Sequence, residues 1–196
     1  MMWDVVVIGS GFAGSLLARL LKLQGRDVLL VERGTHPRFS LGESSTPLAA
    51  LSLERLARCY DQPDLRSLAT HGQWCRDLPM LERGLKRGFS FYRHTPGRSY
   101  QNSEVNESRF LVAASPDAET ADCQWLRSDV DAHLVAQAVA VGVEYCDRSE
   151  VMAVEETSDS IRLTVRQGDC QLDVQARFVV DGSGAGEVIA QALGVE

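Results

Sequence analysis

Residues 5–14 have the sequence VVVIGSGFAG. The unbroken apolar run predicts a parallel strand covered on both faces, which we place at residues 3–8. The glycines that follow fit the spacing G-x-G-x-x-G. In this motif Gly9 permits a tight turn, Gly11 lets the backbone approach a pyrophosphate, and Gly14 lets a helix pack against the strand.

The residues after the glycines complete a β-α-β unit over residues 1–33. Leucines at helical spacing predict a helix at 13–24, and residues 28–31 read as a second buried strand. Amide N–H groups at the helix start, including those of Phe12 and Ala13, face a bound anion. Glu32 lies 18 positions beyond Gly14 and ends the second strand, where its carboxylate accepts hydrogen bonds from ribose hydroxyls. The unit predicts dinucleotide binding; the alternative is a glycine-rich turn without a ligand.

Composition narrows the class of protein. The formal charge is −7, so no basic excess is available for non-specific binding of nucleic acid. Five cysteines, an odd number, are widely spaced and indicate reduced thiols. The four histidines are scattered, and we predict no metal site. We find neither a signal peptide before the first strand nor an apolar run of roughly 20 residues, so we expect a soluble, cytoplasmic chain without a membrane span.

The middle of the chain is less regular. Glycines and prolines mark a long loop after Glu32, and a helix is predicted at 47–59. Residues 61–87 read as irregular, with short helical stretches. Residues 88–92 and 99–101 are predicted to pair as strands around a turn at 95–97.

Regular periodicity returns near Asp129. Apolar residues at helical spacing continue to residue 141, where Gly142 ends the pattern. A short strand at 143–145 precedes three alternating segments at 150–156, 161–166 and 171–176, which predict an antiparallel meander. A further buried strand at 178–180 and a helix at 187–193 follow. The order of elements predicts an α/β fold with a parallel sheet.

Several motifs in this order resemble a large FAD-dependent family that includes aromatic hydroxylases, geranylgeranyl reductases and flavin-dependent halogenases. Glu32-Arg33, Pro37-Arg38 and the stretch LGESSTP at 41–47 are similar to a flavin-contacting loop of the halogenases. The pattern R-x-x-x-D-x-x-L at 127–134 is similar to a helix start shared by the family. Residues 176–184 are similar to the strand and D-x-S-G turn that close on the ADP portion. The resemblance implies FAD rather than NAD as the cofactor.

The resemblance also implies individual cofactor contacts. Arg127 is expected near the flavin and the backbone of Val151 near the adenine. The remaining implied contacts come from the loop and from the last turn: Arg33, Glu43, Ser44, Ser45, Asp181 and Gly182. Local alternatives are a surface pair of Arg127 with Asp131, a helix cap by Asp181 and a solvated Glu43.

The halogenase branch suggests a reaction. Residues 84–91, GLKRGFSF, resemble a halogenase segment in which a lysine beside the substrate receives the oxidised halogen. Lys86 is therefore the candidate catalytic residue, and the alternative is a solvated basic surface shared with neighbouring arginines. The implied activity is a flavin-dependent monooxygenase of halogenase type that acts on an aromatic or other electron-rich small molecule. A separate flavin reductase is the partner that this activity implies.

Two family motifs are missing. The family's downstream G-D motif would lie beyond residue 196, and the segment W-x-W-x-I-P does not occur in the 196 residues, so the chain resembles the first two-fifths to one-half of a family member. We therefore expect one FAD-binding domain of the glutathione-reductase/aromatic-hydroxylase type over 1–196, incomplete at its C-terminus. Its parts are the cradle at 1–33, a partial substrate-side insertion at about 62–125 and a return to the sheet at 126–196. A reductase or dehydrogenase of the geranylgeranyl reductase kind, and a non-catalytic truncated dinucleotide-binding module, remain alternatives.

Overall fold

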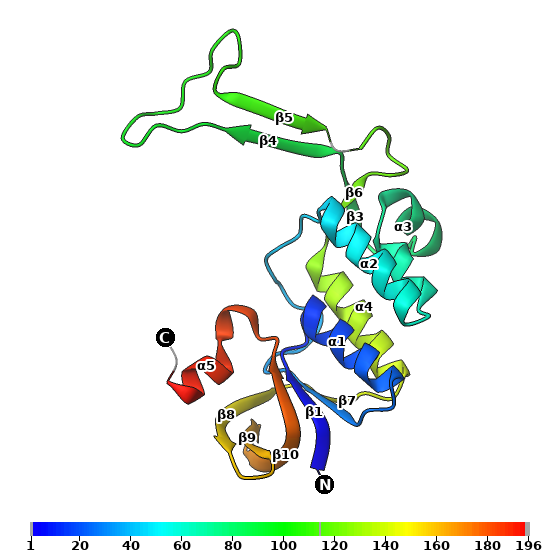
Figure 1. Cartoon of the computed structure of the whole chain (residues 1–196), viewed down its shortest axis with the longest axis vertical. Coiled ribbons are helices and arrows are strands. Elements are labelled where there is room, and N and C mark those ends of the chain that lie inside the picture. Colours follow the sequence, from blue (N-terminus) through cyan, green and yellow to red (C-terminus); the bar gives the residue numbers. More distant parts are fainter. Residues whose placement is uncertain (1, 114, 195–196) are drawn as a thin grey trace. The chain divides into compact units, whose positions relative to one another are not determined.

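The computed structural model describes residues 2–113 and 115–194 (Figure 1). The chain divides into two compact units. Unit 1 combines the chain up to Leu41 with the chain from Arg127 onward, and unit 2 is Gly42–Leu126. Within the described residues, no helix has the length and apolar character needed to cross a membrane.

Unit 1 is built on a six-stranded sheet with the order β7-β2-β1-β10-β9-β8. The parallel part contains β1 (Met2–Ile8), β2 (Val28–Val31), β7 (Glu144–Cys146) and the second half of β10 (Cys170–Asp181). Strands β8 (Ser149–Glu156) and β9 (Ile161–Gln167) continue it as an antiparallel meander. The predicted α/β fold with a parallel sheet and a meander is therefore confirmed.

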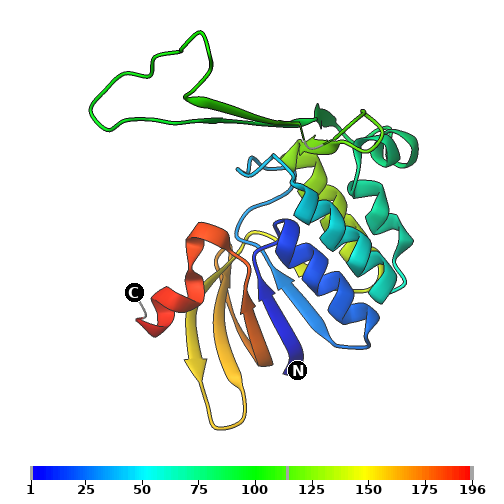
Figure 2. The same ribbon diagram turned by 45° about the horizontal axis from the view of Figure 1, so that its top comes forward.

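Each face of this sheet has its own apolar core. Helices α1 (Phe12–Leu23) and α4 (Arg127–Ala140) lie side by side against one face (Figures 1 and 2). Alternate residues of β1 and β2 point to that face, and the intervening residues point to the other. The first core contains Val5, Val7, Ala18, Val28, Leu30, Ala138 and Val143, whereas the second contains Val6, Ile8, Leu29, Val31, Leu163, Val165 and Ala176. This two-sided burial explains the unbroken apolar sequence of both strands.

One prediction about the meander is wrong in detail. The strands expected at 171–176 and 178–180 are a single strand, β10. Residues 170–176 pair with the antiparallel β9, and residues 175–181 pair with the parallel β1. The strand changes neighbours without a break, because backbone pairing continues where the side-chain alternation is interrupted. After β10, a short 3₁₀ turn η2 (Gly184–Gly186) leads into α5 (Val188–Leu193).

Unit 2 begins with α2 (Pro47–Cys59), whose N-terminus is capped by the Thr46 hydroxyl through a 3.3 Å bond from the Ala49 amide. The stretch expected to be irregular contains the 3₁₀ helix η1 (Pro63–Leu68), α3 (His71–Asp77) and β3 (Arg83–Lys86). Strand β3 pairs with β6 (Asp122–Trp125).

The hairpin predicted at 88–92 and 99–101 is wrong in its second strand. Strand β4 (Gly88–Tyr92) pairs with β5 (Arg109–Ala113), and residues 99–101 belong to no strand. A turn does form at the predicted position, with a 3.2 Å bond from the Arg98 amide to the Thr95 carbonyl. Beyond that turn the chain continues to β5. There Phe110 and Val112 pair opposite Phe91 and Phe89 of β4, as apolar cross-strand pairs that stabilise the hairpin.

Candidate functional site

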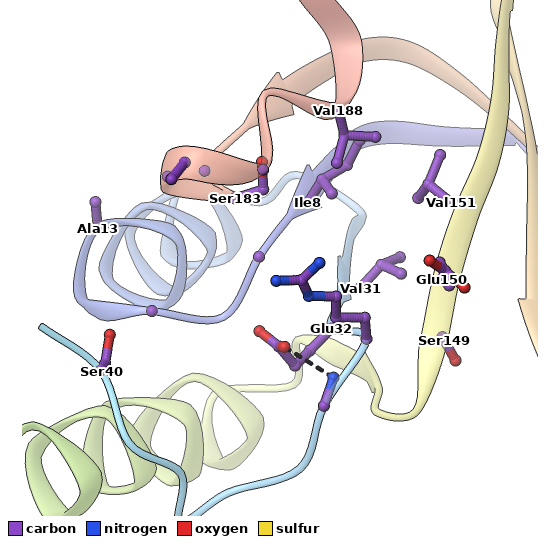
Figure 3. Close-up of a pocket in the computed structure, with 18 of the residues that line it drawn as sticks. Ile8, Ala13, Val31, Glu32, Ser40, Ser149, Glu150, Val151, Ser183 and Val188 are labelled. Atoms are coloured by element: carbon purple, nitrogen blue, oxygen red, sulfur yellow. Dashed lines mark hydrogen bonds between the residues drawn. The ribbon is translucent and has the colours of Figure 1, made fainter. Parts of the chain in front are cut away.

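A cleft of unit 1 opens at the carboxyl ends of β1, β2 and β10 and has a volume of about 1070 Å³. Figure 3 shows side chains such as Ala13, Glu32, Val151 and Ser183 around it. Nine residues predicted to contact a cofactor line this cleft: Gly9, Gly11, Phe12, Ala13, Glu32, Arg33, Arg127, Val151 and Gly182. In open α/β sheets, this edge is where ligands bind.

Gly9 and Gly14 are required by the fold itself. Gly9 has φ +92°, and a Cβ added there would lie 2.6 Å from the carbonyl oxygen of Gly182. A Cβ on Gly14 would lie 1.9 Å from the carbonyl oxygen of Gly9. Because neither backbone can move away cheaply, both glycines permit α1 and the turn after β10 to pack against the end of β1.

Gly11 has a different environment. Its backbone has φ −69°, which any residue adopts, and an added Cβ would meet no atom closer than 3.7 Å, the distance to Nη2 of Arg127. Helix α1 begins at the next residue, and the first turn of a helix leaves its amide N–H groups without intrahelical partners. Gly11 therefore lies at a helix N-terminus beside the guanidinium groups of Arg127 and Arg38, an environment that suits an anion.

Glu32 is buried, with 5% of its surface exposed, and its carboxylate accepts four hydrogen bonds. Oε2 accepts from the Ser10 amide (2.9 Å), the Ser10 hydroxyl (2.9 Å) and Nη2 of Arg38 (3.1 Å), and Oε1 accepts from the Gly34 amide (2.9 Å). Burial alone would raise the pKa of Glu32, but these donors outweigh it and hold the pKa below its ordinary value. The carboxylate is therefore ionised at neutral pH.

Two further side chains adjoin Ser10. Nε2 of His36 lies 2.8 Å from the Ser10 hydroxyl, and the Tyr145 hydroxyl lies 3.5 Å from it. Burial and the nearby Arg38 guanidinium lower the pKa of His36, although Glu32 and Asp131 oppose this shift. Burial raises the pKa of Tyr145. Both side chains are therefore neutral at pH 7 beside an ionised Glu32.

Arg127 forms a two-pronged ion pair at the start of α4. Its Nε and Nη2 donate to the two carboxylate oxygens of Asp131 at 2.9 and 3.0 Å, and Nη1 donates to the Leu41 carbonyl at 2.7 Å. The side chain of Asp131 is fully buried and that of Arg127 is 13% exposed. The alternative of a surface pair is therefore wrong, and the pair fixes the guanidinium at the cleft.

Asp181 does not line the cleft, but it organises the turn that does. Its carboxylate accepts bonds from the Ser183 amide (2.9 Å), the Ser183 hydroxyl (2.5 Å) and the Ile189 amide in the first turn of α5 (2.8 Å). Burial alone would raise the pKa of Asp181. Hydrogen bonds from the Ser183 hydroxyl and from three backbone N–H groups outweigh burial and hold the pKa below its ordinary value. These contacts agree with the helix-capping alternative and place Gly182 and Ser183 in the cleft lining.

The predicted loop residues Glu43, Ser44 and Ser45 belong to unit 2. Their backbone pairs with β6: the Trp125 amide donates to the Glu43 carbonyl at 2.6 Å, and Ser44 forms a bridge with Gln124. The buried Ser45 hydroxyl accepts from the Cys123 amide at 2.9 Å. Glu43 lines a smaller hollow of about 480 Å³ in unit 2, beside Arg83 and Trp125.

Lys86 also belongs to unit 2 and is buried, with 6% of its surface exposed. Its ammonium donates to the Ser45 carbonyl and lies 4.0 Å from the centroid of the Phe89 ring. Its register partner on β6 is the buried Asp122, whose pKa is raised by burial and partly lowered again by Lys86. The alternative of a solvated basic surface therefore does not describe Lys86.

The sequence reasoning missed part of the cleft. Arg38, quoted within the loop motif but not chosen as a contact, lies beside Glu32, and its charge at this position was the available signal. Residues 183–186, SGAG, follow the predicted contact Gly182 and line the cleft with it as a second glycine-rich turn. Ser40, Met152 and Gln191 also line it, and no motif in the sequence marks them.

The segment that contains the glycine motif matches the model of a known family. Residues 7–68 match the model of an NAD(P)-binding Rossmann-like domain. This match begins near the end of β1 and includes the glycine turn, α1, β2, the following loop, α2 and η1, in agreement with the two glycines packed at the end of β1.

Longer matches come from individual proteins. Monodechloroaminopyrrolnitrin halogenase PrnC of Pseudomonas fluorescens is 29% identical over 182 residues, which is 93% of this chain and 31% of that protein. Tetracycline 7-halogenase of Kitasatospora aureofaciens is 29% identical over 194 residues, covering 98% of this chain and 33% of that protein. The crystal structure of halogenase PltM in complex with phloroglucinol and FAD superposes with a TM-score of 0.82 at 28% identity. It covers 98% of this chain and 36% of PltM.

The chain thus spans about a third of the length of these relatives. A weaker match, 21% identical over 193 residues, is digeranylgeranylglycerophospholipid reductase 2 of Methanosphaera stadtmanae. The expected resemblance to the halogenase branch is confirmed over nearly the whole chain. The protein has the Rossmann-like α/β fold of FAD-dependent halogenases and is similar to about a third of such an enzyme.

Proposed function

We propose that this chain binds FAD in the cleft of unit 1 and forms the FAD-binding part of a flavin-dependent monooxygenase of halogenase type. The observation that carries the proposal is the cleft at Gly11, a position whose backbone does not itself require glycine and where an added Cβ would lie 3.7 and 3.9 Å from the Nη2 atoms of Arg127 and Arg38. A pyrophosphate fits this space, because it is an anion at the N-terminus of α1 and beside the fixed guanidinium of Arg127.

The remaining lining residues suit the rest of the ADP half. Glu32, an ionised acceptor, would bind ribose hydroxyls and would repel a 2′-phosphate. The backbone near Val151 would face the adenine, and Gly182 would let the turn after β10 approach the phosphates. When bound, FAD supplies the redox chemistry; the chain's own residues bind and orient it.

Our preference for a halogenase over a reductase rests on sequence similarity. The two halogenases are 29% identical to this chain, against 21% for the phospholipid reductase. FAD is bound by PltM, which also binds phloroglucinol, an electron-rich small molecule. We propose a substrate of this chemical class, a separate flavin reductase as the source of reduced flavin, and a cytoplasmic location.

Flavin binding is the first test. Purified protein titrated with FAD is expected to quench flavin fluorescence with a Kd in the micromolar range or tighter, and NADP⁺ in excess should not displace FAD. Isothermal titration with ADP should give a measurable affinity, because the proposed contacts lie in the ADP half. Absence of binding to both FAD and ADP would contradict the proposal.

Lys86 is the proposed catalytic residue. Its ammonium is held by the Ser45 carbonyl and the Phe89 ring, so a hydrogen-bond donor would be fixed in one place for an oxidised halogen species. Lys86 belongs to unit 2, whereas the residues proposed to bind the ADP half belong to unit 1.

In a preparation that halogenates phloroglucinol, Lys86→Met should lower the halogenation rate at least about 100-fold, because it retains the stem but removes the donor. Product formation is measured by mass spectrometry with reduced FAD, oxygen and bromide supplied. Arg87→Met is the matched control, since the neighbouring Arg87 is exposed and donates to the Pro116 carbonyl. Retention of halogenation in Lys86→Met would refute the role of Lys86.

A further inference from the structure

A chain of hydrogen bonds leads from His36 through Ser10 to Glu32 at the edge of the cleft. The Ser10 hydroxyl lies 2.9 Å from Oε2 of Glu32 and 2.8 Å from Nε2 of His36. An ionised carboxylate can only accept, so the single hydroxyl proton of Ser10 points to Glu32. Nε2 of His36 must then donate to the Ser10 oxygen, and this contact fixes the tautomer of His36.

The two carboxylate oxygens of Glu32 accept different numbers of hydrogen bonds. Oε2 accepts three hydrogen bonds, two from Ser10 and one from Arg38, which uses its capacity fully. Oε1 accepts one bond, from the Gly34 amide, and retains capacity for a second donor. Ser10 and Arg38 thus hold Oε2 in place, while Oε1 retains capacity for a donor from a ligand.

We infer that His36 and Ser10 are positioning residues that direct Oε1 of Glu32 toward the ribose hydroxyls of the bound adenine nucleotide. They thereby make the cleft discriminate ribose from its deoxy forms. This inference rests on the proposed function, because it concerns the nucleotide that the cleft would hold. Ser10 acts through both its amide and its hydroxyl, whereas His36 acts only by orienting the hydroxyl.

The charges around His36 keep this arrangement intact at neutral pH. Arg38, Glu32 and Asp131 act on His36 electrostatically, and Tyr145 approaches the same Ser10 hydroxyl. Burial and Arg38 lower the pKa of His36, so the imidazole is neutral and retains one donor nitrogen. A neutral amide with an N–H group at the same place should therefore replace it.

The test compares the affinities of ADP and 2′,3′-dideoxy-ADP by isothermal titration. Wild-type protein is expected to prefer ADP by about tenfold or more, because loss of the hydroxyls leaves Oε1 without its donor. Ser10→Ala and His36→Phe should reduce that preference below about threefold. His36→Gln should restore most of it, since the glutamine amide can donate to Ser10.

The ratio of the affinities for ADP and 2′,3′-dideoxy-ADP distinguishes a loss of positioning from a general loss of stability. A variant that is merely less stable weakens both ligands equally, and thermal unfolding of each variant measures that loss. Wild-type protein that binds neither ADP nor FAD would contradict the proposed function. Binding with an unchanged preference in Ser10→Ala would overturn only this inference, and His36→Gln behaving like His36→Phe would overturn the donor role of His36.

Discussion

Gly11→Ala is expected to weaken FAD binding at least about 100-fold, or about 2.7 kcal/mol, while the protein remains folded. A methyl group at this position meets no protein atom within 3.7 Å and requires no unusual backbone angle. It would, however, occupy the space in which the pyrophosphate must approach the backbone. Fluorescence titration with FAD measures the affinity, and urea unfolding should detect a loss of only about 1 kcal/mol, the cost of alanine at a helix N-cap.

Gly14→Ala is the contrasting variant. Its Cβ would lie 1.9 Å from the Gly9 carbonyl oxygen, so α1 could not pack against β1 as it does. Loss of binding in that variant should accompany loss of the folded state. If Gly11→Ala binds FAD like the wild type, the pyrophosphate does not lie over Gly11 and the proposed orientation of the cofactor is wrong.

The contrast between these glycines also shows which features of the site could be predicted from the sequence alone. The spacing of Gly9, Gly11 and Gly14 after an apolar strand predicts their positions, because a fixed turn geometry permits few residues. Their separate roles follow only from neighbours distant in sequence, such as Gly182 and Arg127. The cradle was therefore predictable from local sequence, and the rest of the cleft lining was not.

The errors have a common physical origin. Strand β10 changes partners in mid-strand, and β5 pairs with β4 across a long connection, so both depend on backbone pairing between distant segments. Alternating side chains predict strands but not their partners. The same limit applies to the alternative considered for Lys86: the neighbouring arginines allowed a solvated basic surface, whereas the side chain is buried and contacts the Ser45 carbonyl and the Phe89 ring.

Arg127→Ala is expected to lower the free energy of unfolding of the protein by about 3–5 kcal/mol. The variant would leave the fully buried Asp131 carboxylate without its two guanidinium bonds, at 2.9 and 3.0 Å. A solvated pair at the same i, i+4 spacing would contribute only a few tenths of a kcal/mol. Urea unfolding followed by far-UV circular dichroism measures the difference.

Two further variants separate burial from charge. Arg166 pairs with Glu150 on the neighbouring strands β9 and β8, where both side chains are about half exposed, and Arg166→Ala should cost less than about 1 kcal/mol. The double variant Arg127→Leu/Asp131→Leu should be more stable than Arg127→Ala, since it leaves no unpaired buried charge. It should nevertheless bind FAD more weakly than wild type, because Arg127 lines the cleft. Equal losses in Arg127→Ala and Arg166→Ala would mean that Asp131 is hydrated in solution and that the pair does not anchor the cleft.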